Sequence, residues 1–544
     1  MSKKQAIPIA KWIAALTGSG KGIEAAPPDE DYGAYLAATE PDDGALAQQR
    51  AYAFDRMPRF YIVIKGKGRQ ADVKRTRAAL ERQTYPAWEV CDDPAAAGET
   101  EDFVMRIEEG DILSPQALFC FAVAADAHRD KFLYYADEDV LVGDVRERPL
   151  FKPEFSRVTA LSYDLFGRPL AIRRDVYLAS RPPARDAEEA EEYAFALRCL
   201  ERTQTAMHIP LVLLSRSLPP EPMDAAGGCR AISGFLSNTK EDATVSTGLW
   251  PGSFFVAARG KPNKRTAIVI PNREGLEALR RALESIEECC PMDEYTIVIA
   301  DGGSESPRLL HYYDLLEKNK AARIVHCEKK GFATLCNAGA DAAPSDGLLF
   351  LSRDAELLSP DTLRVLSGQV ARPGVGAAGC KLVDEKRRIV FAGGVAGLCG
   401  KTGSPYAGEE DIAPGDCDSR RLLFTETLRT VTLLSGACMY LPTDVFLSAG
   451  RFDETFDDPV VAGVAPLGAD AELSVRLLRR GLACVYTPFA TAMLHRVLPA
   501  VDEAGDGVAL RCQDALRELI LAGDPYYSPN LVLNRAIPVV KREI

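Results

Sequence analysis

The sequence lacks the features that would place the protein in a membrane, on a nucleic acid or in an oxidising compartment. None of its apolar runs approaches the roughly 18–20 residues that a membrane-spanning helix needs. The net charge of −13 argues against a polyanion as the main partner, so we expect no nucleic-acid ligand. The 14 cysteines form no C-x-x-C pair, which is typical of buried thiols in a reducing cytosol. With no signal-peptide core either, the sequence predicts a cytoplasmic protein.

Two features near the N-terminus concern membrane contact and nucleotide binding. Residues 10–16 are apolar with lysines nearby, which predicts either a helix packed on the first domain or an interfacial helix that makes peripheral membrane contact. The TGSGKG sequence at Thr17 has neither the glycine spacing of a phosphate-binding loop nor the hydroxyl residue after its lysine. We therefore assign no nucleotide to it.

A long internal repeat sets the domain organisation of the 544 residues. The first half contains FYIVIKGKG and then FVMRIEEGDILSP, and the second half contains TAIVIPNREG and then LLFLSRDAELLSP. Each copy has the pattern strand, helix, strand, acidic turn and a further helix, which predicts two α/β domains. The expected divisions are an N-terminal helical extension (1–55), a first domain (56–217), a structured linker (218–264), a second domain (265–500) and a C-terminal tail (501–544).

Polar residues follow the predicted strands of the second half. The apolar run 267–270 stops at Pro271 and Asn272, the run 296–300 stops at Asp301, and the run 348–351 is followed closely by Asp354. A parallel crossover unit binds ligands where its strands end. Asp301 is therefore placed to accept a hydrogen bond from a base or ribose, and Asp354 to hold a divalent cation against phosphate oxygens.

The ordered set of motifs resembles the inverting family 2 glycosyltransferases of the GT-A fold, in particular bacterial tandem-domain enzymes of the rhamnosyltransferase and O-antigen type. In the second half the motifs are GFATLCNAGADAA, VFAGGVAGLCG, LLSGACMYLPTDVFLSAGRFDETF and GADAELSVRLLRRGLACVYTP, and in the tail DPYYSPNL. In the first half QTYPAWEV, YADEDV and FKPEF match, whereas the catalytic positions mostly do not. The resemblance implies two tandem GT-A domains and an α/β fold throughout.

By position, the resemblance also implies a site in the second half. Asp470 matches the catalytic base that takes a proton from the acceptor hydroxyl, and Asp354 and His495 match the metal ligands for Mg²⁺ or Mn²⁺. The residues expected to contact the nucleotide are Pro271, Asn272, Asp301, Asn337, Arg353 and Asp354. The implied donor is a UDP- or dTDP-linked sugar, and the implied acceptor is a glycan or a lipid-linked glycan.

Two departures from the family pattern leave an alternative open. Arg353 stands where the family usually has a carboxylate, and Ala469 replaces the usual polar residue before Asp470. A guanidinium at that place either weakens metal binding or itself contacts the diphosphate. The alternative is a non-catalytic pseudo-glycosyltransferase scaffold in a glycan-assembly complex. A nucleotidyltransferase, the third interpretation, leaves Asp470 and the DPYYSPNL tail unexplained.

The first half is expected to be catalytically silent. The segment between Cys91 and Phe103 is too short for the helix that faces the nucleotide in the second half. The base position falls at Glu192, its neighbour at Ala194 and the histidine position at Ser215. We therefore predict that this domain serves packing, acceptor handling or partner contact, because a shared fold does not by itself confer activity.

Overall fold

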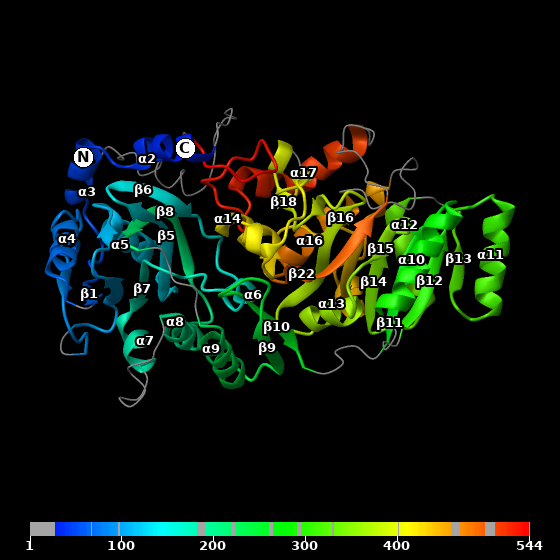
Figure 1. Ribbon diagram of the computed structural model, residues 1–544, viewed down its shortest axis with the longest axis horizontal. Helices are drawn as coiled ribbons and strands as arrows, with labels where there is room; N and C mark the ends of the chain where they lie inside the picture. Colours follow the sequence, from blue (N-terminus) through cyan, green and yellow to red (C-terminus); the bar gives the residue numbers. More distant parts are fainter. Residues whose placement is uncertain are drawn as a thin grey trace, which may run out of the picture.

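The computed structural model describes residues 28–542 except 67, 96–97, 182–191, 219–223, 260–264, 291–294, 329–330, 401, 458–467 and 496–505. The helix expected at 10–16 lies outside the described residues. Two α/β domains lie along the long axis of the molecule (Figure 1). None of the helices within the described residues combines the length and the apolar character that a bilayer crossing requires.

The first domain is built on one twisted sheet. Its strands are β1 (Phe60–Lys65), β2 (Trp88–Val90), β3 (Phe103–Glu108), β4 (Ile112–Leu113), β5 (Leu133–Val142), β6 (Val145–Leu150), β7 (Leu170–Arg173) and β8 (Met207–Arg216). Its helices are α4 (Gln70–Glu81), α5 (Ala117–Ala127), α6 (Arg157–Ala160), α7 (Arg174–Ala179) and α8 (Glu192–Thr203).

The second domain repeats this plan with additional elements. Its main strands are β11 (Thr266–Asn272), β12 (Tyr295–Asp301), β13 (Arg323–His326), β14 (Gly347–Leu351), β15 (Ala355–Leu357), β16 (Val375–Asp384), β17 (Ile389–Phe391), β20 (Arg429–Val431), β21 (Cys438–Pro442) and β22 (Ala483–Leu494), and β18 (Val395–Ala396) pairs with β19 (Thr402–Gly403). Its helices are α10 (Leu276–Cys289), α11 (Pro307–Lys318), α12 (Phe332–Ala342), α13 (Thr362–Val370), α14 (Ser419–Thr425), α15 (Thr443–Ser448) and α16 (Ala469–Arg479), with short 3-10 turns η2 (Leu398–Gly400), η3 (Pro414–Asp416) and η4 (Glu454–Phe456).

The two sheets have the same topology. The strand order is β2-β1-β3-β7-β5-β8-β4 in the first domain, and the order β12-β11-β14-β21-β16-β22-β15 in the second domain matches it strand for strand. Pairing directions match as well, since β1 is parallel to β2 and β3 as β11 is to β12 and β14, while β7 and β21 both run antiparallel to their neighbours. This agreement confirms the two tandem α/β domains that the sequence predicts.

The side chains of β11 alternate between two hydrophobic cores, which determines the register of this strand. All seven of its residues are buried, because helices cover both faces of the sheet. Ile268 and Ile270 pack in one core with α10, whereas Ala267 and Val269 pack in the other with Phe332 of α12. A slip by one residue would exchange the two faces, so the register of the strand is strongly determined. The polar residues that follow the strand are therefore held at one defined edge.

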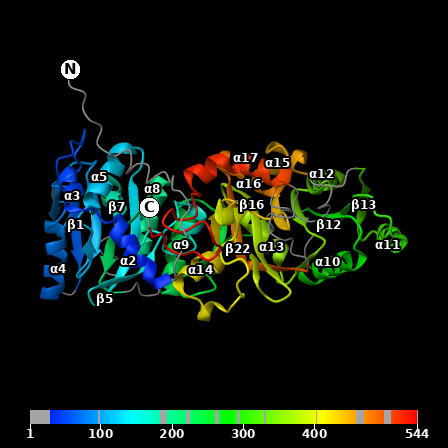
Figure 2. The same ribbon diagram turned by 90° about the horizontal axis from the view of Figure 1, so that it is seen from above.

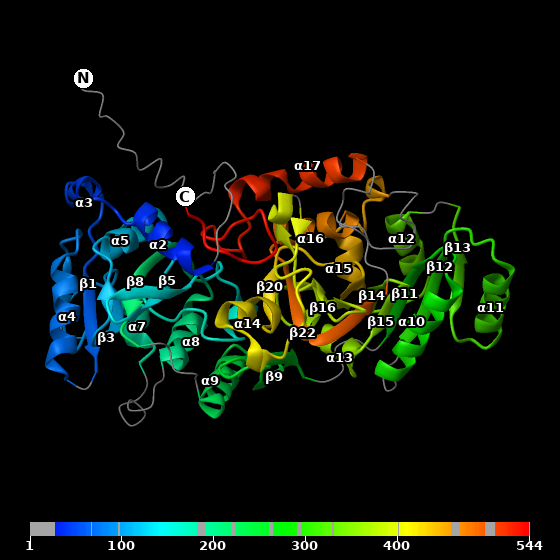
Figure 3. The same ribbon diagram turned by 45° about the horizontal axis from the view of Figure 1, so that its top comes forward.

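The remaining elements lie outside the two sheets. They are α2 (Pro28–Thr39), α3 (Asp43–Arg50), α9 (Ala225–Asn238), the hairpin β9 (Ala243–Thr247) and β10 (Phe254–Ala258), and α17 (Asp506–Ala522). Glu241, between α9 and β9, bonds Arg157 of the first domain (2.6 Å) and Arg372 of the second (2.9 Å). Beyond α17, which lies against α16 (Figure 3), the chain returns toward the first domain (Figure 2), where Asn530 donates to Asp137 (3.1 Å).

Candidate active site

Three strands of the second sheet end side by side, and the predicted nucleotide-binding residues follow them. Asn272 is the last residue of β11 and lies in register with Asp301, the last residue of β12. On the other side of β11, β14 ends at Leu351, and Arg353 and Asp354 follow it at the same edge. Because all three strands are parallel, their carboxyl ends meet where α/β proteins bind ligands.

The carboxylate of Asp301 is enclosed by its neighbours. The residue is only 1% exposed, and its oxygens accept from the amide (3.2 Å) and the hydroxyl of Ser304 and from Tyr313 Oη (3.1 Å). Burial and the nearby Asp301 raise the pKa of Tyr313, so the phenol keeps its proton and donates. His326 Nδ1 lies 3.4 Å from Asp301 Oδ2. The side chain is therefore fixed, and His326 lies against one of its oxygens.

Arg353 links the end of β11 to Asp354. Its Nη1 donates to Asn272 Oδ1 (3.1 Å), to the carbonyl of Glu274 (3.0 Å) and to the carbonyl of Arg273. Its Nε lies 3.5 Å from Asp354 Oδ2. The guanidinium is buried at 7% exposure, so its positive charge is felt strongly at this edge of the sheet.

Asp354 fits a metal ligand better than His495 does. Asp354 is 7% exposed, and its Oδ2 accepts no hydrogen bond in the described structure, so Arg353 Nε at 3.5 Å is the neighbour that a cation would meet there. His495 meets Asp354 through the backbone, its amide donating to the Asp354 carbonyl (3.0 Å). The His495 ring instead lies between Glu356 (Nε2 to Oε2, 2.5 Å) and Glu385 (Nδ1 to Oε1, 2.8 Å). The described residues contain no group of three or more side chains placed to hold a metal ion.

Asp470 occupies the first turn of α16 and is completely buried. Oδ2 accepts from the amide of Gly436 (2.8 Å), and Oδ1 accepts from the amides of Gly468 (2.9 Å) and Ala471 (2.8 Å). Burial raises the pKa of Asp470 to about 6, against the opposing effect of these hydrogen bonds. Gly436 is required here, since a Cβ would come within 2.7 Å of the Phe332 ring. A carboxylate with a pKa near neutrality, held in one orientation, suits a general base.

Two other predicted nucleotide-binding residues hold the fold together. The Asn337 amide donates to the Phe452 carbonyl (3.0 Å) and to Glu454 (3.3 Å), and its oxygen accepts from the Phe452 amide (3.2 Å). It therefore ties α12 to the chain before η4. Pro271 is a strand residue of β11, in register with Ala300 of β12.

Sequence reasoning missed Asp457. Its carboxylate accepts from the Ala333 amide (2.6 Å) and from the amide (3.1 Å) and hydroxyl (2.5 Å) of Thr334, and thereby caps the N-terminus of α12. Burial raises the pKa of Asp457. The one hint in the sequence is that Gly331, the residue before α12, has no side chain to cap the helix. The backbone amides of the first turn therefore need an acceptor from elsewhere in the chain.

Strand register identifies the equivalent positions of the two domains. In the first domain Phe60 pairs with Phe103 and Ile112 with Ser215, and in the second Thr266 pairs with Gly347 and Glu356 with Met493. Counting from these pairs gives the following equivalents: Gly110 for Asp354, Ser217 for His495, Glu192 for Asp470, Gly167 for Gly436 and Arg168 for Ala437. The predicted histidine position, Ser215, is therefore corrected to Ser217. The correspondence is fixed by the pairing of β4 with β8 and of β15 with β22, which a motif match does not show.

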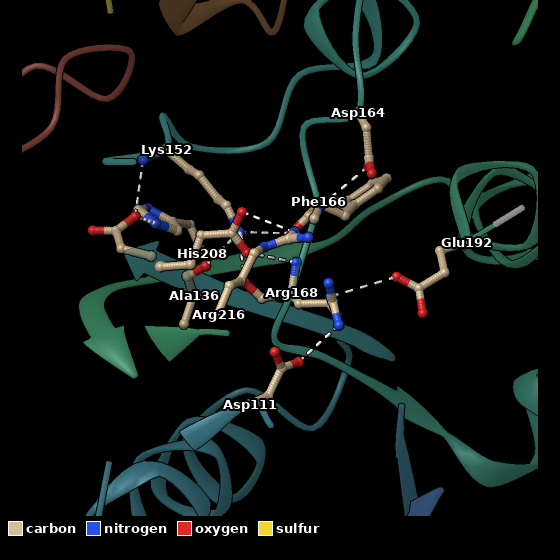
Figure 4. Close-up of polar contacts among 12 residues, drawn as sticks. Asp111, Ala136, Lys152, Asp164, Phe166, Arg168, Glu192, His208 and Arg216 are labelled. Atoms are coloured by element: carbon tan, nitrogen blue, oxygen red, sulfur yellow. Dashed lines mark hydrogen bonds and ion pairs between the residues drawn. The ribbon is translucent and has the colours of Figure 1, made fainter. Parts of the chain in front are cut away.

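The centre of the first domain is occupied by Arg168 (Figure 4). Its Nη1 lies 2.7 Å from Asp111 Oδ2 and 3.0 Å from Glu108 Oε2, and its Nε lies 3.7 Å from Glu192 Oε2. Lys152, also buried, holds the preceding loop by donating to the carbonyl of Phe166 (2.7 Å). Burial raises the pKa of Asp111 to about 6, and Arg168 opposes the rise. Here a guanidinium belonging to the chain lies among the carboxylates.

Two curated proteins are similar to nearly the whole chain. The O-antigen biosynthesis protein RfbC of Myxococcus xanthus is 27% identical over 572 residues, which covers 94% of this chain and 44% of that protein. The uncharacterized protein y4gI of Sinorhizobium fredii is 27% identical over 457 residues, which covers 80% of this chain and 49% of that protein. The chain thus spans less than half the length of these relatives.

Solved structures and a family model also match. GalNAc-T7 with UDP, GalNAc and Mn²⁺ has a TM-score of 0.35 at 16% identity, covering 47% of this chain and 48% of that one. The mannosyltransferase PcManGT from Pyrobaculum calidifontis with GDP-Man and Mn²⁺ has a TM-score of 0.29 at 17% identity, covering 45% and 58%. The model of glycosyl transferase family 2 matches residues 267–391, which include β11, β12 and β14 with their polar ends. Within its second domain, the chain is therefore similar to glycosyl transferase family 2.

Proposed function

We propose that the second domain transfers a sugar from a nucleotide sugar to an acceptor hydroxyl with inversion at the anomeric carbon. The observation that carries the proposal is the continuous polar row at one sheet edge, from Asp301 through Asn272 and Arg353 to Asp354. The row follows the ends of the neighbouring strands β12, β11 and β14, so a nucleoside can lie at one end and a diphosphate at the other. The donor class is a UDP- or dTDP-linked sugar, and the acceptor is a glycan or a lipid-linked glycan.

The chemistry of the row matches the charge of such a donor. Asp354 would hold Mg²⁺ or Mn²⁺ through Oδ2, which accepts no hydrogen bond, and the ion would neutralise charge on the leaving diphosphate. Arg353, fixed against the backbone at the end of β11, adds a positive charge that needs no reorganisation when the diphosphate arrives. We assign both residues to the leaving group.

Asp470 is the proposed general base. It takes the proton of the acceptor hydroxyl as that oxygen forms its bond to the anomeric carbon, and the bond between this carbon and the diphosphate oxygen breaks. The leaving nucleoside diphosphate carries away the electron pair. Attack on one face and departure from the other invert the centre, as in hydrolases that use a carboxylate to activate water. The fixed orientation and raised pKa of Asp470 support this role.

A scaffold without catalytic activity is the alternative, and one observation favours it. The second carboxylate that metal-dependent relatives carry is replaced by Arg353, whose Nη1 already serves backbone carbonyls. In that case the second domain organises glycan-assembly enzymes without consuming a donor. The free cysteines of the described residues fit a cytoplasmic location under either proposal.

Nucleotide binding and product analysis test the proposal together. The purified chain is melted with UDP, dTDP or GDP and Mg²⁺ or Mn²⁺; a ligand at 100 times its dissociation constant should stabilise the folded state by about 2.7 kcal/mol. Incubation with nucleotide sugars and candidate acceptors should release the nucleoside diphosphate. Binding without turnover would favour the scaffold, and release of pyrophosphate would indicate nucleotidyl transfer. No shift with any nucleotide at millimolar concentration would refute the proposal.

A further inference from the structure

The carboxylate predicted to read the nucleobase cannot reach one directly. Only 2% of the Asp301 side chain is exposed. Its oxygens accept from Ser304 and Tyr313, and His326 Nδ1 lies 3.4 Å from Oδ2. Asn272 supports the arrangement by donating to Tyr313 Oη (2.6 Å). These contacts come from the side chains and backbone around the end of β12, so Asp301 is held within the protein.

His326 is the residue that connects Asp301 to solvent. It is the last residue of β13, in register with Asp301 on the neighbouring strand, and 68% of its side chain is exposed. Its ring lies edge-on to Tyr313, with 6.5 Å between centroids. A planar, accessible ring therefore stands at the carboxyl edge of the sheet, at the end of the polar row opposite Asp354.

The contact with Asp301 determines which hydrogen bond the ring can offer. Because the carboxylate can only accept, His326 Nδ1 carries the proton and donates to Asp301 Oδ2 (3.4 Å). In the neutral imidazole, Nε2 is then a hydrogen-bond acceptor. An acceptor that faces the ring nitrogen of the pairing edge pairs with the N–H of uracil, thymine or guanine, whereas cytosine and adenine present a lone pair at that nitrogen and donate only from the neighbouring amino group.

We propose that His326 is the residue that determines base specificity, reading the base N–H through Nε2, and that Asp301 is a positioning residue that fixes the ring. The inference rests on the proposed function, since it assumes a nucleotide donor. It selects donors linked to UDP, dTDP or GDP over donors linked to CDP or ADP. Arg353 and Asp354 contact the diphosphate alone and contribute nothing to this choice.

Calorimetric titration of UDP, dTDP, GDP, CDP and ADP with Mn²⁺ tests the inference on the full chain. We expect the wild type to bind UDP at least about fivefold more tightly than CDP, as one neutral hydrogen bond allows. His326→Ala should bring UDP and CDP to equal affinity, and His326→Phe, which keeps a ring but has no ring nitrogen, should also lose the preference. Asp301→Asn should narrow the UDP-to-CDP ratio because it releases the ring.

Two controls separate this inference from the proposed function. His311→Ala changes an exposed histidine of α11 and should leave every affinity unchanged. Asp354→Asn should weaken all five nucleotides in the presence of Mn²⁺ without changing their ratios. A wild type that binds no nucleotide would overturn the proposed function. A wild type that binds all bases equally, or a His326→Ala variant that keeps the preference with an unchanged melting temperature, would overturn the role of His326 alone.

Discussion

Arg168 of the first domain and Ala437 of the second stand at the same place in the repeated fold. Each directly follows a glycine, Gly167 or Gly436, in the loop before the antiparallel strand at the centre of its sheet. In the second domain the side chain at this place is only the methyl group of Ala437, which adds no charge near Asp470. In the first domain the guanidinium fills the corresponding space and is bound by Asp111 at 2.7 Å. One substitution thus places a guanidinium in the first domain where the second domain has a methyl group.

The first domain should therefore be silent in catalysis but sensitive in stability. Glu192 is half-buried and lies 3.7 Å from Arg168, so Glu192→Gln should leave the transfer rate within about twofold and stability nearly unchanged. Asp111→Ala should leave turnover of the folded enzyme within about twofold as well. It should nevertheless destabilise the fold by about 3 kcal/mol, because it removes the buried partner of a buried guanidinium. Thermal melting and initial rates of both variants check this.

A loss of turnover in the double variant Asp111→Ala with Glu192→Gln, at a temperature where it is folded, would contradict the prediction. That result would mean that the first domain is a second active site.

Asp470→Asn should abolish transfer while preserving donor binding. Only proton removal from the acceptor is lost, so kcat should fall by about 10²–10⁴-fold and the dissociation constant for UDP should stay within about twofold. The wild-type rate should also rise with pH through an apparent pKa near 6, since only the deprotonated carboxylate accepts a proton and burial raises its pKa to about 6. Initial rates between pH 5 and 8 test both statements. A variant as fast as the parent would exclude Asp470 as the base.

The sequence predicted the edge of the second sheet well because its determinants are local. The apolar runs 267–270 and 348–351 lie inside β11 and β14, and Asp301 ends β12 as expected. The contacts of these residues could not be predicted, because they are made by residues distant in the chain. Asn337 bonds Phe452, and Arg168 meets Asp111 across 57 positions. The position of Ser215 was misjudged because strand pairing, which fixes the correspondence, cannot be read from a motif match.

Arg353→Asp should make the activity of the second domain depend more strongly on the metal ion. Arg353 now places a positive charge 3.5 Å from Asp354 Oδ2, which opposes cation binding there, and an aspartate would supply a second carboxylate. Mn²⁺ titration followed by electron paramagnetic resonance should show tighter binding, and activity should fall more steeply when metal is removed. Arg353→Gln is the matched control, because it removes the charge without adding a ligand and should give an intermediate affinity. An unchanged titration in Arg353→Asp would show that the guanidinium does not influence the metal site.

The last prediction concerns the junction between the domains, where Glu241 bonds a cation from each side. Its Oε2 accepts from Arg157 of the first domain and its Oε1 from Arg372 of the second, and Glu241 and Arg372 are almost fully buried. Glu241→Ala leaves the Arg372 guanidinium in an apolar environment without an anion, which should cost about 3–5 kcal/mol. The neighbouring Asp242 is paired with Arg259 on the surface, so Asp242→Ala is the matched control and should change stability by less than about 1 kcal/mol.

Deleting residues 1–255 goes further: it removes Glu241 and Trp250, whose indole donates to Thr427 (3.0 Å), and exposes the apolar surface that they cover. We expect the deletion to yield aggregated protein, and size-exclusion chromatography will detect it. A truncated second domain that is monomeric and binds UDP with the affinity of the full chain would mean that the first domain serves a partner or the acceptor rather than the stability of the second.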